Sequence, residues 1–354
     1  MTMFQPESPS ATVFTGVSII IPCHNYSQSF TRCLDAIVLS ADRLSDYDRS
    51  RMEVIVVDDA SKPPLVLRNI QLSIRIIRLE AGRGAGYARN AGLCSAKWSH
   101  LLFVDSDVYL APDHLPCLFA RLTSSPTRAV LQGLHYPYSA GVEPDLFMHY
   151  LAASWYVYMS TELLDSNRNP AVVFTACFAI GKKFLQDLGG FSERFSGSGG
   201  EEFELSARIS NLPENPIRLD PQLLSAHVYD TAYWRLKKLW RRSRHYELTI
   251  GKILNIPSSF RRRTLARLSI ACAQTFALML TIIAIANPFW NPAIPGMVYG
   301  ILLIFSSIYD RRQTCLIARQ HGWKLVALSP FFRQLEFITV SLGMVVQFIR
   351  GRIK

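Results

Sequence analysis

The sequence predicts an α/β fold with a mostly parallel, doubly wound sheet, followed by a basic C-terminal region of membrane-associated helices. Four apolar runs in the first third resemble buried parallel strands, at residues 17–22, 54–57, 74–79 and 101–104. Segments with helical features separate them, and strands that alternate with helices imply right-handed crossovers. Past residue 260 the chain changes to long uncharged runs with basic flanks. We therefore expect a tail over 1–14, an α/β domain over 15–250 and a membrane region over 251–354.

Two helices are expected between the first four strands. After the first strand, apolar residues recur three and four positions apart, which is typical of a helix with one buried face: Phe30, Cys33, Leu34, Ile37 and Val38. The glycine-rich run 84–96 suits a turn that leads into a short helix. Further on, 147–159 is expected to be a core helix, with the wall of an acceptor site as the alternative, and 174–180 another strand.

The C-terminal region carries two uncharged runs. Residues 268–286 approach the ~20 residues that a helix needs to cross a bilayer. A proline-rich turn and a shorter run, 296–309, follow. Arginines at 261–263 and at 311–312 flank the pair, which places both outer ends on the cytoplasmic side of a hairpin over about 268–309. The stretch 334–350 is expected to be an interfacial amphipathic helix. The alternative is that all three are core helices of a soluble domain.

The charge is unevenly distributed along the chain. The net charge is +11, yet residues 231–354 carry 19 Lys and Arg against three acids, whereas the remainder has 19 bases against 24 acids. A basic, apolar tail fits an anionic lipid surface, and its long uncharged runs argue against a nucleic-acid partner. Seven scattered cysteines without CxxC spacing indicate neither a disulfide framework nor a zinc site and fit a reducing cytoplasm. We expect no secretory signal.

Two aspartates, Asp105 and Asp107, directly follow the strand 101–104. Alternate side chains of an extended strand point the same way, so we expect the two carboxylates to converge. Their oxygens suit Mg²⁺ or Mn²⁺, and open α/β sheets bind ligands at the carboxyl ends of their strands. The pair therefore predicts a divalent cation that neutralises a diphosphate. The alternative is an Asp-x-Asp surface turn.

Polar residues follow the first two strands as well: Pro22, His24 and Asn25 after the first, and Asp58 and Asp59 after the second. Because these strand ends share one edge of the sheet, they are the expected place for a nucleotide. A carboxylate there can accept hydrogen bonds from a base N–H or a ribose hydroxyl. The alternatives are a helix N-cap for one aspartate and a simple turn for His24 and Asn25.

A glycine-rich segment follows the third strand. Gly82, Gly84 and Gly86 let the backbone approach a ligand, and the nearby donors are Arg83, Arg89 and Asn90. The spacing does not indicate a dinucleotide site, since such a site follows the first strand. We therefore expect this segment to bind the same diphosphate-containing ligand as the strand ends.

A second glycine-rich loop, 189–200, leads into Glu201 and Glu202 at the start of a helix. One of these carboxylates is expected to be a general base that takes a proton from an acceptor hydroxyl. The alternative is stabilisation of the helix by acids in its first turn. His227 follows this helix, and its imidazole is a candidate third metal ligand, with a structural role as the alternative.

Taken in order, these motifs resemble the family 2 glycosyltransferases with a GT-A fold, over roughly residues 15–245. The resemblance rests on VSIIIPCHN, VIVVDDAS, GRGAGYARNAGL, LLFVDSD, FTACFAIGKKFLQDLGGF and GSGGEEFELSARI. It implies that Pro22, His24, Asn25, Asp58 and Asp59 bind the nucleotide. It also implies that Asp105 and Asp107 hold Mg²⁺ or Mn²⁺ against the diphosphate, and that Glu202 is the base of an inverting displacement. Family members usually have Glu-Asp where this chain has Glu201-Glu202.

The expected activity is transfer of a sugar from a nucleoside-diphosphate sugar, in the first place a UDP-sugar, to a hydroxyl acceptor. The QxxRW motif of processive relatives has no match near Trp240, so we expect one or a few sugars to be added. The basic tail suggests a lipid-linked or envelope-glycan acceptor at the cytoplasmic face of a membrane. The alternatives are transfer onto polyprenyl phosphate and an inactive nucleotide-sugar-binding membrane protein. A small transporter is disfavoured, because two short spans cannot line a pathway.

Overall fold

The computed structural model describes most of the chain, namely residues 13–67, 72–124, 129–138, 145–157, 172–195, 200–210, 212, 216–228, 231–242, 258–287 and 289–352. The N-terminal tail up to residue 12 lies outside the described residues. The chain forms two units. The first unit comprises Met1–Leu134 and Val172–Ala226, and the second comprises 135–171 and 227–354. The segment 135–171 thus belongs with the C-terminal region, which the sequence pattern does not indicate.

Eight strands form one sheet in the order β3-β2-β1-β4-β7-β6-β8-β5. They are β1 (Val17–Cys23), β2 (Met52–Asp58), β3 (Ile74–Arg78), β4 (His100–Val104), β5 (Val108–Leu110), β6 (Val130–Tyr138), β7 (Cys177–Gly181) and β8 (Ile217–Val228). The pairs β1·β2, β1·β4 and β2·β3 are parallel, and β7 is antiparallel to β4 and β6. The four strands predicted in the first third are confirmed. The later one begins at Cys177 because Thr175 and Ala176 form a turn.

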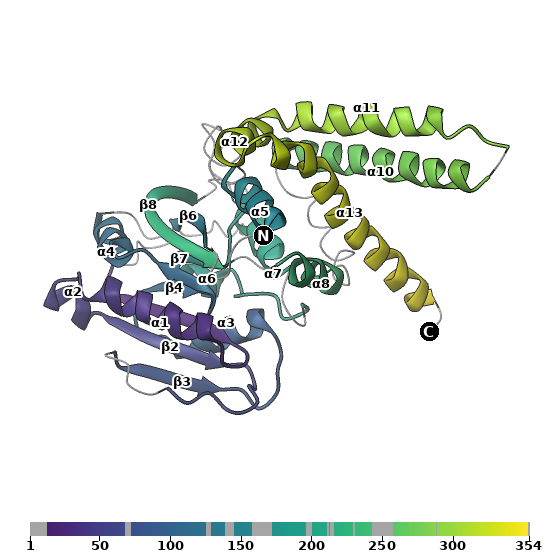
Figure 1. Cartoon of the computed structure of the whole chain (residues 1–354). Helices are drawn as coiled ribbons and strands as arrows, with labels where there is room; N and C mark the ends of the chain where they lie inside the picture. The colour runs from purple at the N-terminus through teal and green to yellow at the C-terminus, as the bar shows by residue number, and fades with distance from the viewer. Residues whose placement is uncertain are drawn as a thin grey trace, which may run out of the picture. The chain divides into compact units, whose positions relative to one another are not determined.

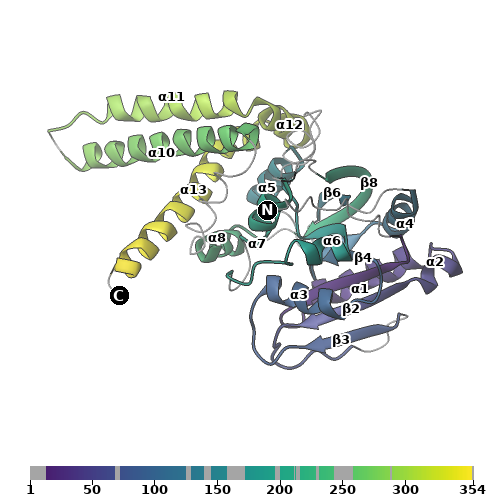
Figure 2. The same ribbon diagram turned by 180° about the vertical axis from the view of Figure 1, so that it is seen from behind.

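Helices cover both faces of the sheet in the first unit. Alternate strand residues point to opposite faces, so Ile19 and Ile21 pack with α1 (Gln28–Ala41) and α4 (His114–Ser124). Ile20 and Phe103 pack with α3 (Ala85–Ser95), α6 (Lys182–Asp187) and α7 (Glu201–Ser210). The ribbon shows α1 in front of the strands in Figure 1 and α3 in front of them in Figure 2. A further short helix, α2 (Asp46–Ser50), precedes β2.

The apolar spacing of α1 accounts for its place in the core. Phe30, Leu34 and Ile37 lie on one side of the helix and are fully or almost fully buried. The helix begins at a serine cap, since the Ser27 hydroxyl accepts a hydrogen bond from the Phe30 backbone N–H. The predicted helix is therefore confirmed, and it starts shortly after the end of β1.

The described residues of the second unit are mostly helical, and the ends of β6 and β8 also belong to it. It contains α5 (Leu146–Val157), α8 (Ala232–Arg242), α10 (Ser258–Ala286), α11 (Ala293–Tyr309), α12 (Arg311–His321) and α13 (Trp323–Arg352). Its core joins Phe147, Tyr150 and Leu151 of α5 to Ile317 of α12 and Leu325 of α13. The segment 147–159 was expected to be a core helix, and α5 agrees with this up to Val157.

Helices α10 and α11 form an antiparallel hairpin, drawn in green in Figure 1. The amide of Gln274 donates to the Leu302 carbonyl, and Gly296 lies against Thr281. Among the described residues, one helix is long and apolar enough to span a membrane, at Ser269–Ala286, and Ala293–Tyr309 is a shorter apolar helix. The predicted interfacial segment 334–350 is part of α13, which is a single helix about twice that length.

Candidate functional site

Asp105 and Asp107 lie in a turn between β4 and β5. The Asp105 backbone N–H donates to the Ala176 carbonyl at 2.8 Å, and the Val108 N–H donates to the Asp105 carbonyl at 3.0 Å. The strand has therefore ended at Val104, and the expectation that strand alternation aligns the two carboxylates is wrong. The turn keeps both aspartates at the end of β4, so the position of the motif at the edge of the sheet is as predicted.

A buried arginine connects this turn to the start of α7. Arg89 on α3 donates from Nη2 to Asp105 Oδ1 at 2.6 Å and from Nη1 to Glu201 Oε1 at 3.1 Å. The side chains of Arg89 and Glu201 are 2% and 4% exposed, and that of Asp105 is 29% exposed. Segments distant in the chain are thus brought together by one guanidinium group. Asp105 is the member of the group that solvent reaches.

The environment of Arg89 keeps its guanidinium group protonated. Burial lowers the pKa of the guanidinium, but Asp105 and Glu201 outweigh burial, and the net pKa is raised above the ordinary arginine value. The guanidinium carbon also lies 5.4 Å from the centre of the Phe191 ring, a cation–π distance. The group is therefore a permanent positive charge between two carboxylates.

Glu201 and Glu202 are the first two residues of α7, as the sequence predicts. Glu201 is the partner of Arg89, and Glu202 accepts a hydrogen bond at Oε2 from the Gly200 N–H at 2.8 Å. The Glu202 side chain is half-buried. Because Glu201 is committed to a buried ion pair, Glu202 is the better placed of the two to exchange a proton. The preceding stretch 196–199 of the glycine loop lies outside the described residues.

The loop before α7 is held by residues that the sequence reasoning partly missed. Asn90 bonds both ways to the Phe191 backbone, with its Nδ2 donating at 2.9 Å and its Oδ1 accepting at 2.8 Å. Its predicted contact with a ligand stays a prediction. Arg208 of α7 donates to the Gly190 carbonyl at 2.7 Å and pairs with the buried Glu204. The four-residue spacing of Glu204 and Arg208 is the signal that could have indicated this pair.

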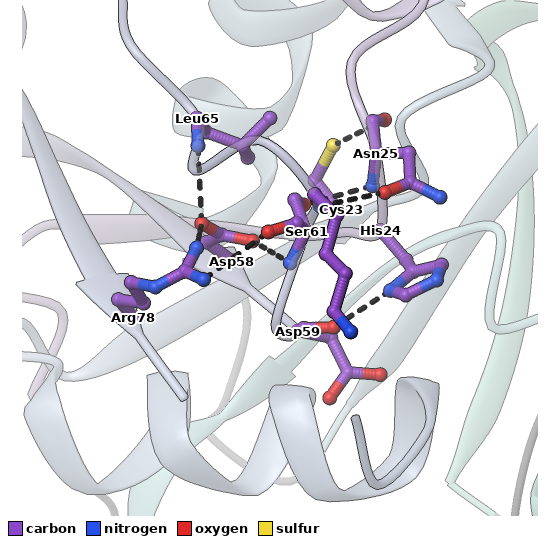
Figure 3. A network of polar contacts seen from close by, with 9 residues as sticks. Cys23, His24, Asn25, Asp58, Asp59, Ser61, Leu65 and Arg78 are labelled. Atoms are coloured by element: carbon purple, nitrogen blue, oxygen red, sulfur yellow. Dashed lines mark hydrogen bonds and ion pairs between the residues drawn. The ribbon is translucent and has the colours of Figure 1, made fainter. Parts of the chain in front are cut away.

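Asp58 is a structural carboxylate in this arrangement (Figure 3). It accepts from the Ser61 N–H at 2.8 Å, from the Leu65 N–H at 3.2 Å and from the Arg78 guanidinium. Burial raises the pKa of Asp58, but these hydrogen bonds outweigh it, and the net pKa is lowered from the ordinary aspartate value. Its predicted contact with a nucleotide stays a prediction, and the helix N-cap alternative is wrong for Asp58, because the residues 59–67 that follow it form no helix.

Asp59 anchors the glycine segment that precedes α3. Its Oδ1 accepts from the Arg83 N–H at 2.8 Å, and its Oδ2 accepts from the Gly84 N–H at 2.9 Å. Gly84 has a φ of +93°, a backbone conformation that favours glycine. The carboxylate thus fixes the loop over the end of β2. The guanidinium of Arg83 lies 3.7 Å from the centre of the Tyr87 ring.

The end of β1 is tied to the same region (Figure 3). The Nδ1 of His24 lies 2.7 Å from the Asp59 carbonyl, the Asn25 N–H donates to the Ser61 hydroxyl at 2.8 Å, and the Asn25 Oδ1 accepts from the Lys62 N–H at 3.0 Å. Pro22 is a buried residue of β1. The structure therefore brings together the predicted nucleotide residues of β1 and β2, while His24 and Asn25 remain exposed.

Gly86 is the remaining residue that was predicted to bind the ligand. It lies where α3 approaches the loop before α7. A Cβ atom there would meet the Ser192 carbonyl at 3.4 Å and the Glu201 Cβ at 3.7 Å. Both are ordinary van der Waals distances, so α3 lies against this loop and the start of α7 at Gly86.

A divalent cation could be held by Asp105 and Asp107. Two carboxylates in one turn supply oxygen ligands, and Mg²⁺ or Mn²⁺ completes its coordination with waters and substrate phosphates, so the donor set fits. Over the described ranges, no group of three or more His, Cys, Asp or Glu is arranged to hold a metal ion. His227, the predicted third ligand, belongs to the second unit, where its ring centre lies 6.5 Å from that of His135.

Comparison with known families gives this geometry a context. Residues 18–189 match the sequence model of "Glycosyl transferase family 2". The chain is therefore similar to this family over just under half of its length. This match covers β1 to β7, including the Asp105 turn and Arg89.

The curated relatives of this chain are distant. Glycosyltransferase GlyA of Streptococcus pneumoniae is 24% identical over 234 residues, which is 63% of this chain and 32% of that protein. Poly(ribitol-phosphate) β-N-acetylglucosaminyltransferase TarS of Staphylococcus aureus is 32% identical over 104 residues, or 28% of this chain and 17% of TarS. The chain spans about one third of the length of the first relatives that it matches.

Solved structures agree on the fold. The crystal structure of S. aureus TarS 1-349 in complex with UDP-GlcNAc aligns over 95% of this chain and 92% of that chain, with a TM-score of 0.50 and 19% identity. At this identity the likeness concerns the fold alone. The predicted GT-A α/β fold is thereby confirmed.

Proposed function

We propose that this protein is a glycosyltransferase that moves a sugar from a nucleoside-diphosphate sugar, with a UDP-sugar as the expected donor, to a hydroxyl group of an acceptor. The observation that carries the proposal is the double hydrogen bond of Arg89 to Asp105 and Glu201. It couples the predicted diphosphate site to the predicted catalytic loop, two parts that sugar transfer needs close together.

The diphosphate leaving group would be stabilised at the end of β4. Asp105 and Asp107 would hold Mg²⁺ or Mn²⁺, which neutralises the charge that develops on the departing nucleoside diphosphate. Arg89 supports this role because its contact with Oδ1 fixes the orientation of the Asp105 carboxylate. The nucleoside would bind beside Asp59, with His24 and Asn25 exposed at the same edge.

Glu202 is the proposed general base. It would take the proton from the acceptor hydroxyl as this oxygen attacks the anomeric carbon, and the bond to the diphosphate breaks on the opposite side, so the configuration inverts. The Gly200 N–H bond to Oε2 orients the carboxylate at the start of α7. Glutamate is longer than the aspartate usual in the family, so the Gly200 contact serves to fix a more flexible side chain.

The second unit would hold the protein at the cytoplasmic face of a membrane. Large apolar side chains of the hairpin are exposed, Phe276, Ile282 and Ile285 on α10 and Ile301, Ile304 and Ile308 on α11 among them. Their burial in lipid would remove this surface from water. An acceptor that is lipid-linked, or an envelope glycan, would be concentrated beside such an anchored enzyme, and addition of one or a few sugars fits the lack of a processive motif.

A donor screen tests the proposal. Thermal unfolding of the full chain in detergent is measured with UDP, GDP, CDP and dTDP, each with Mn²⁺ and then with a chelator, and release of nucleoside diphosphate from the matching sugar donor is assayed. The proposal expects one nucleotide to raise the melting temperature only when the metal is present, and expects turnover. Asp105→Asn should abolish both effects, and Asp113→Asn, which changes an exposed aspartate on the same domain, should abolish neither.

Other outcomes would contradict parts of the proposal. A nucleotide shift without any donor turnover would favour the inactive nucleotide-sugar-binding protein. No shift with any nucleotide would overturn donor binding altogether. Turnover that persists in the chelator would remove the metal from the mechanism.

A further inference from the structure

Helix α8 presents an unusual outer face. Five of its 11 residues are Lys or Arg and none is acidic. The side chains of Tyr233 and Trp234 are 65% and 51% exposed, and Trp240 is exposed as well. Exposed apolar patches that polar residues surround often mark interaction sites. In α8 the exposed aromatic side chains are interspersed with basic residues along one short helix.

The opposite face of α8 fixes how this helix is oriented in the second unit. Leu239 is buried, and Arg235 donates to Glu336 of α13 at 2.8 Å. Both views show α13 running past α8 (Figures 1 and 2). Because Leu239 and Arg235 lie four residues apart on the inner side, Trp234, Lys237 and Arg241 are turned outward.

Three side chains of the outer face contact one another, namely Tyr233, Trp234 and Lys237. The ammonium group of Lys237 lies 4.5 Å from the ring centre of Trp234 and 5.4 Å from that of Tyr233. The two aromatic rings meet edge to face, with their centres 5.2 Å apart. The result is a platform of apolar ring surface with positive charge beside it, formed by Tyr233, Trp234, Lys237 and Arg241.

We infer that this platform is a membrane-binding surface that recognises anionic lipid headgroups. Tyrosine and tryptophan prefer the boundary between headgroups and acyl chains, where the ring is buried and its polar atom stays wet. Lysine and arginine beside them pair with lipid phosphates and extend their stems along apolar surface. The charge of the region agrees, since 19 bases against three acids follow Thr231.

The inference deepens the proposed function and rests on it in one respect, the membrane attachment of the second unit. The apolar side chains of the hairpin do not select lipids by charge, whereas the α8 platform would. The platform therefore supplies a preference for anionic membranes and a second, electrostatic contact that salt weakens.

Hydrogen exchange of the full chain in nanodiscs tests the inference. One set of nanodiscs contains phosphatidylcholine alone, and the other contains phosphatidylcholine with phosphatidylglycerol. We expect amides of 232–242 to exchange at least about tenfold more slowly in the anionic nanodiscs. The double variant Lys237→Glu/Arg241→Glu should lose this difference. The matched control Arg43→Glu/Lys183→Glu, with the same charge change at exposed sites of the first unit, should keep it.

Each outcome separates the platform from the hairpin. Equal exchange of α8 in the two nanodiscs, or equally slow exchange in detergent, would overturn the inference. Protection of α8 by an added RNA oligomer but not by the anionic nanodisc would also overturn it, in favour of nucleic acid. If 269–286 exchanges freely in every nanodisc while α8 is protected in the anionic ones, the proposed span fails and the platform stands.

Discussion

Arg89 and Asp105 are joined by a hydrogen bond of 2.6 Å, although the guanidinium is almost fully buried and the carboxylate is partly open to solvent. The second arm of Arg89 holds Glu201, which is as deeply buried as the arginine. A buried ion pair contributes little net stability, but removal of one partner leaves a charge without compensation. Replacing one residue of the group Arg89, Asp105 and Glu201 should therefore lower the free energy of unfolding strongly, so substitutions there test the site sensitively.

Replacing Arg89 should damage stability and activity together. Arg89→Met removes the buried guanidinium that faces the Glu201 carboxylate, so we expect the free energy of unfolding in urea to fall by about 3–5 kcal/mol. The double variant Arg89→Met/Glu201→Gln should recover much of this loss because the buried carboxylate that faced Arg89 is then replaced by a neutral amide. It should not recover donor turnover, since Asp105 has still lost its positioning partner.

A surface arginine provides the matched control for Arg89. Arg121→Met removes an ion pair with Asp220 in which the arginine is about half exposed, and such pairs contribute roughly 0–1 kcal/mol. If Arg89→Met lowers the free energy of unfolding by no more than Arg121→Met does, the buried ion pairs of Arg89 do not stabilise the fold more than a surface pair. Urea unfolding curves of the four proteins, measured in the same detergent, decide between these results.

Glu202→Gln should separate chemistry from binding. The amide oxygen can still accept from the Gly200 N–H, so the start of α7 keeps its structure, but the side chain can no longer take a proton. We expect kcat to fall by about 10²–10⁴-fold, with the nucleotide-induced rise in melting temperature retained. Full turnover in Glu202→Gln would assign the base to another residue.

Asp58 and Asp59 should respond differently to replacement by asparagine. Asp58→Asn loses the charge that faces Arg78 and sets an N–H₂ group against backbone donors, which costs about 1–3 kcal/mol of folding free energy. Asp59→Asn should loosen the loop held at the Arg83 and Gly84 amides and weaken nucleotide binding. Hydrogen exchange of 82–86 and nucleotide titration are the measurements that distinguish the two variants.

The contribution of Asp58 also has a defined pH dependence. Its pKa is lowered in the folded state, so its stabilisation is fully present above the ordinary aspartate value and is lost as the pH falls through the folded value. The difference in unfolding free energy between wild type and Asp58→Asn should therefore vanish in strongly acidic solution. A difference that persists there would assign the cost to packing.

The regular elements of the first unit follow directly from sequence pattern. The run Ile19-Ile20-Ile21 is apolar on both sides because helices cover both faces of the sheet, and only a buried strand requires this. The alternation of strands and helices then fixes where the carboxyl ends of β1, β2 and β4 lie. For this reason the residues that end these strands could be assigned to one edge from sequence alone.

The contacts within the site were harder to predict. Asp105 and Glu201 are far apart in the chain, and no local pattern indicates that Arg89 joins them. Asp59 and Asn90 were predicted to bind a ligand, which stays a prediction, whereas their hydrogen bonds to backbone groups of neighbouring loops had no signal in the sequence. Such loops must have their buried polar groups paired, a demand of tertiary structure that sequence periodicity does not carry.

His114 should make the fold sensitive to mild acid. Its imidazole is buried, its Nδ1 lies 2.8 Å from the Leu224 carbonyl, and burial lowers its pKa to about 4. Between pH 6.5 and 4 the unfolded chain binds a proton at this residue while the folded protein does not, so stability falls as the pH falls through that window. The loss approaches about 3 kcal/mol at the lower end, at about 1.4 kcal/mol for each pKa unit.

His114→Asn tests this directly, because the asparagine amide can still donate to the Leu224 carbonyl but does not titrate. Urea unfolding between pH 7 and pH 4 should show a flatter decline for this variant than for wild type. His24→Asn, which changes an exposed histidine, should keep the wild-type decline. Equal slopes for wild type and His114→Asn would mean that protonated His114 is accommodated in the folded protein, by movement of α4 away from β8 or by entry of water beside the ring.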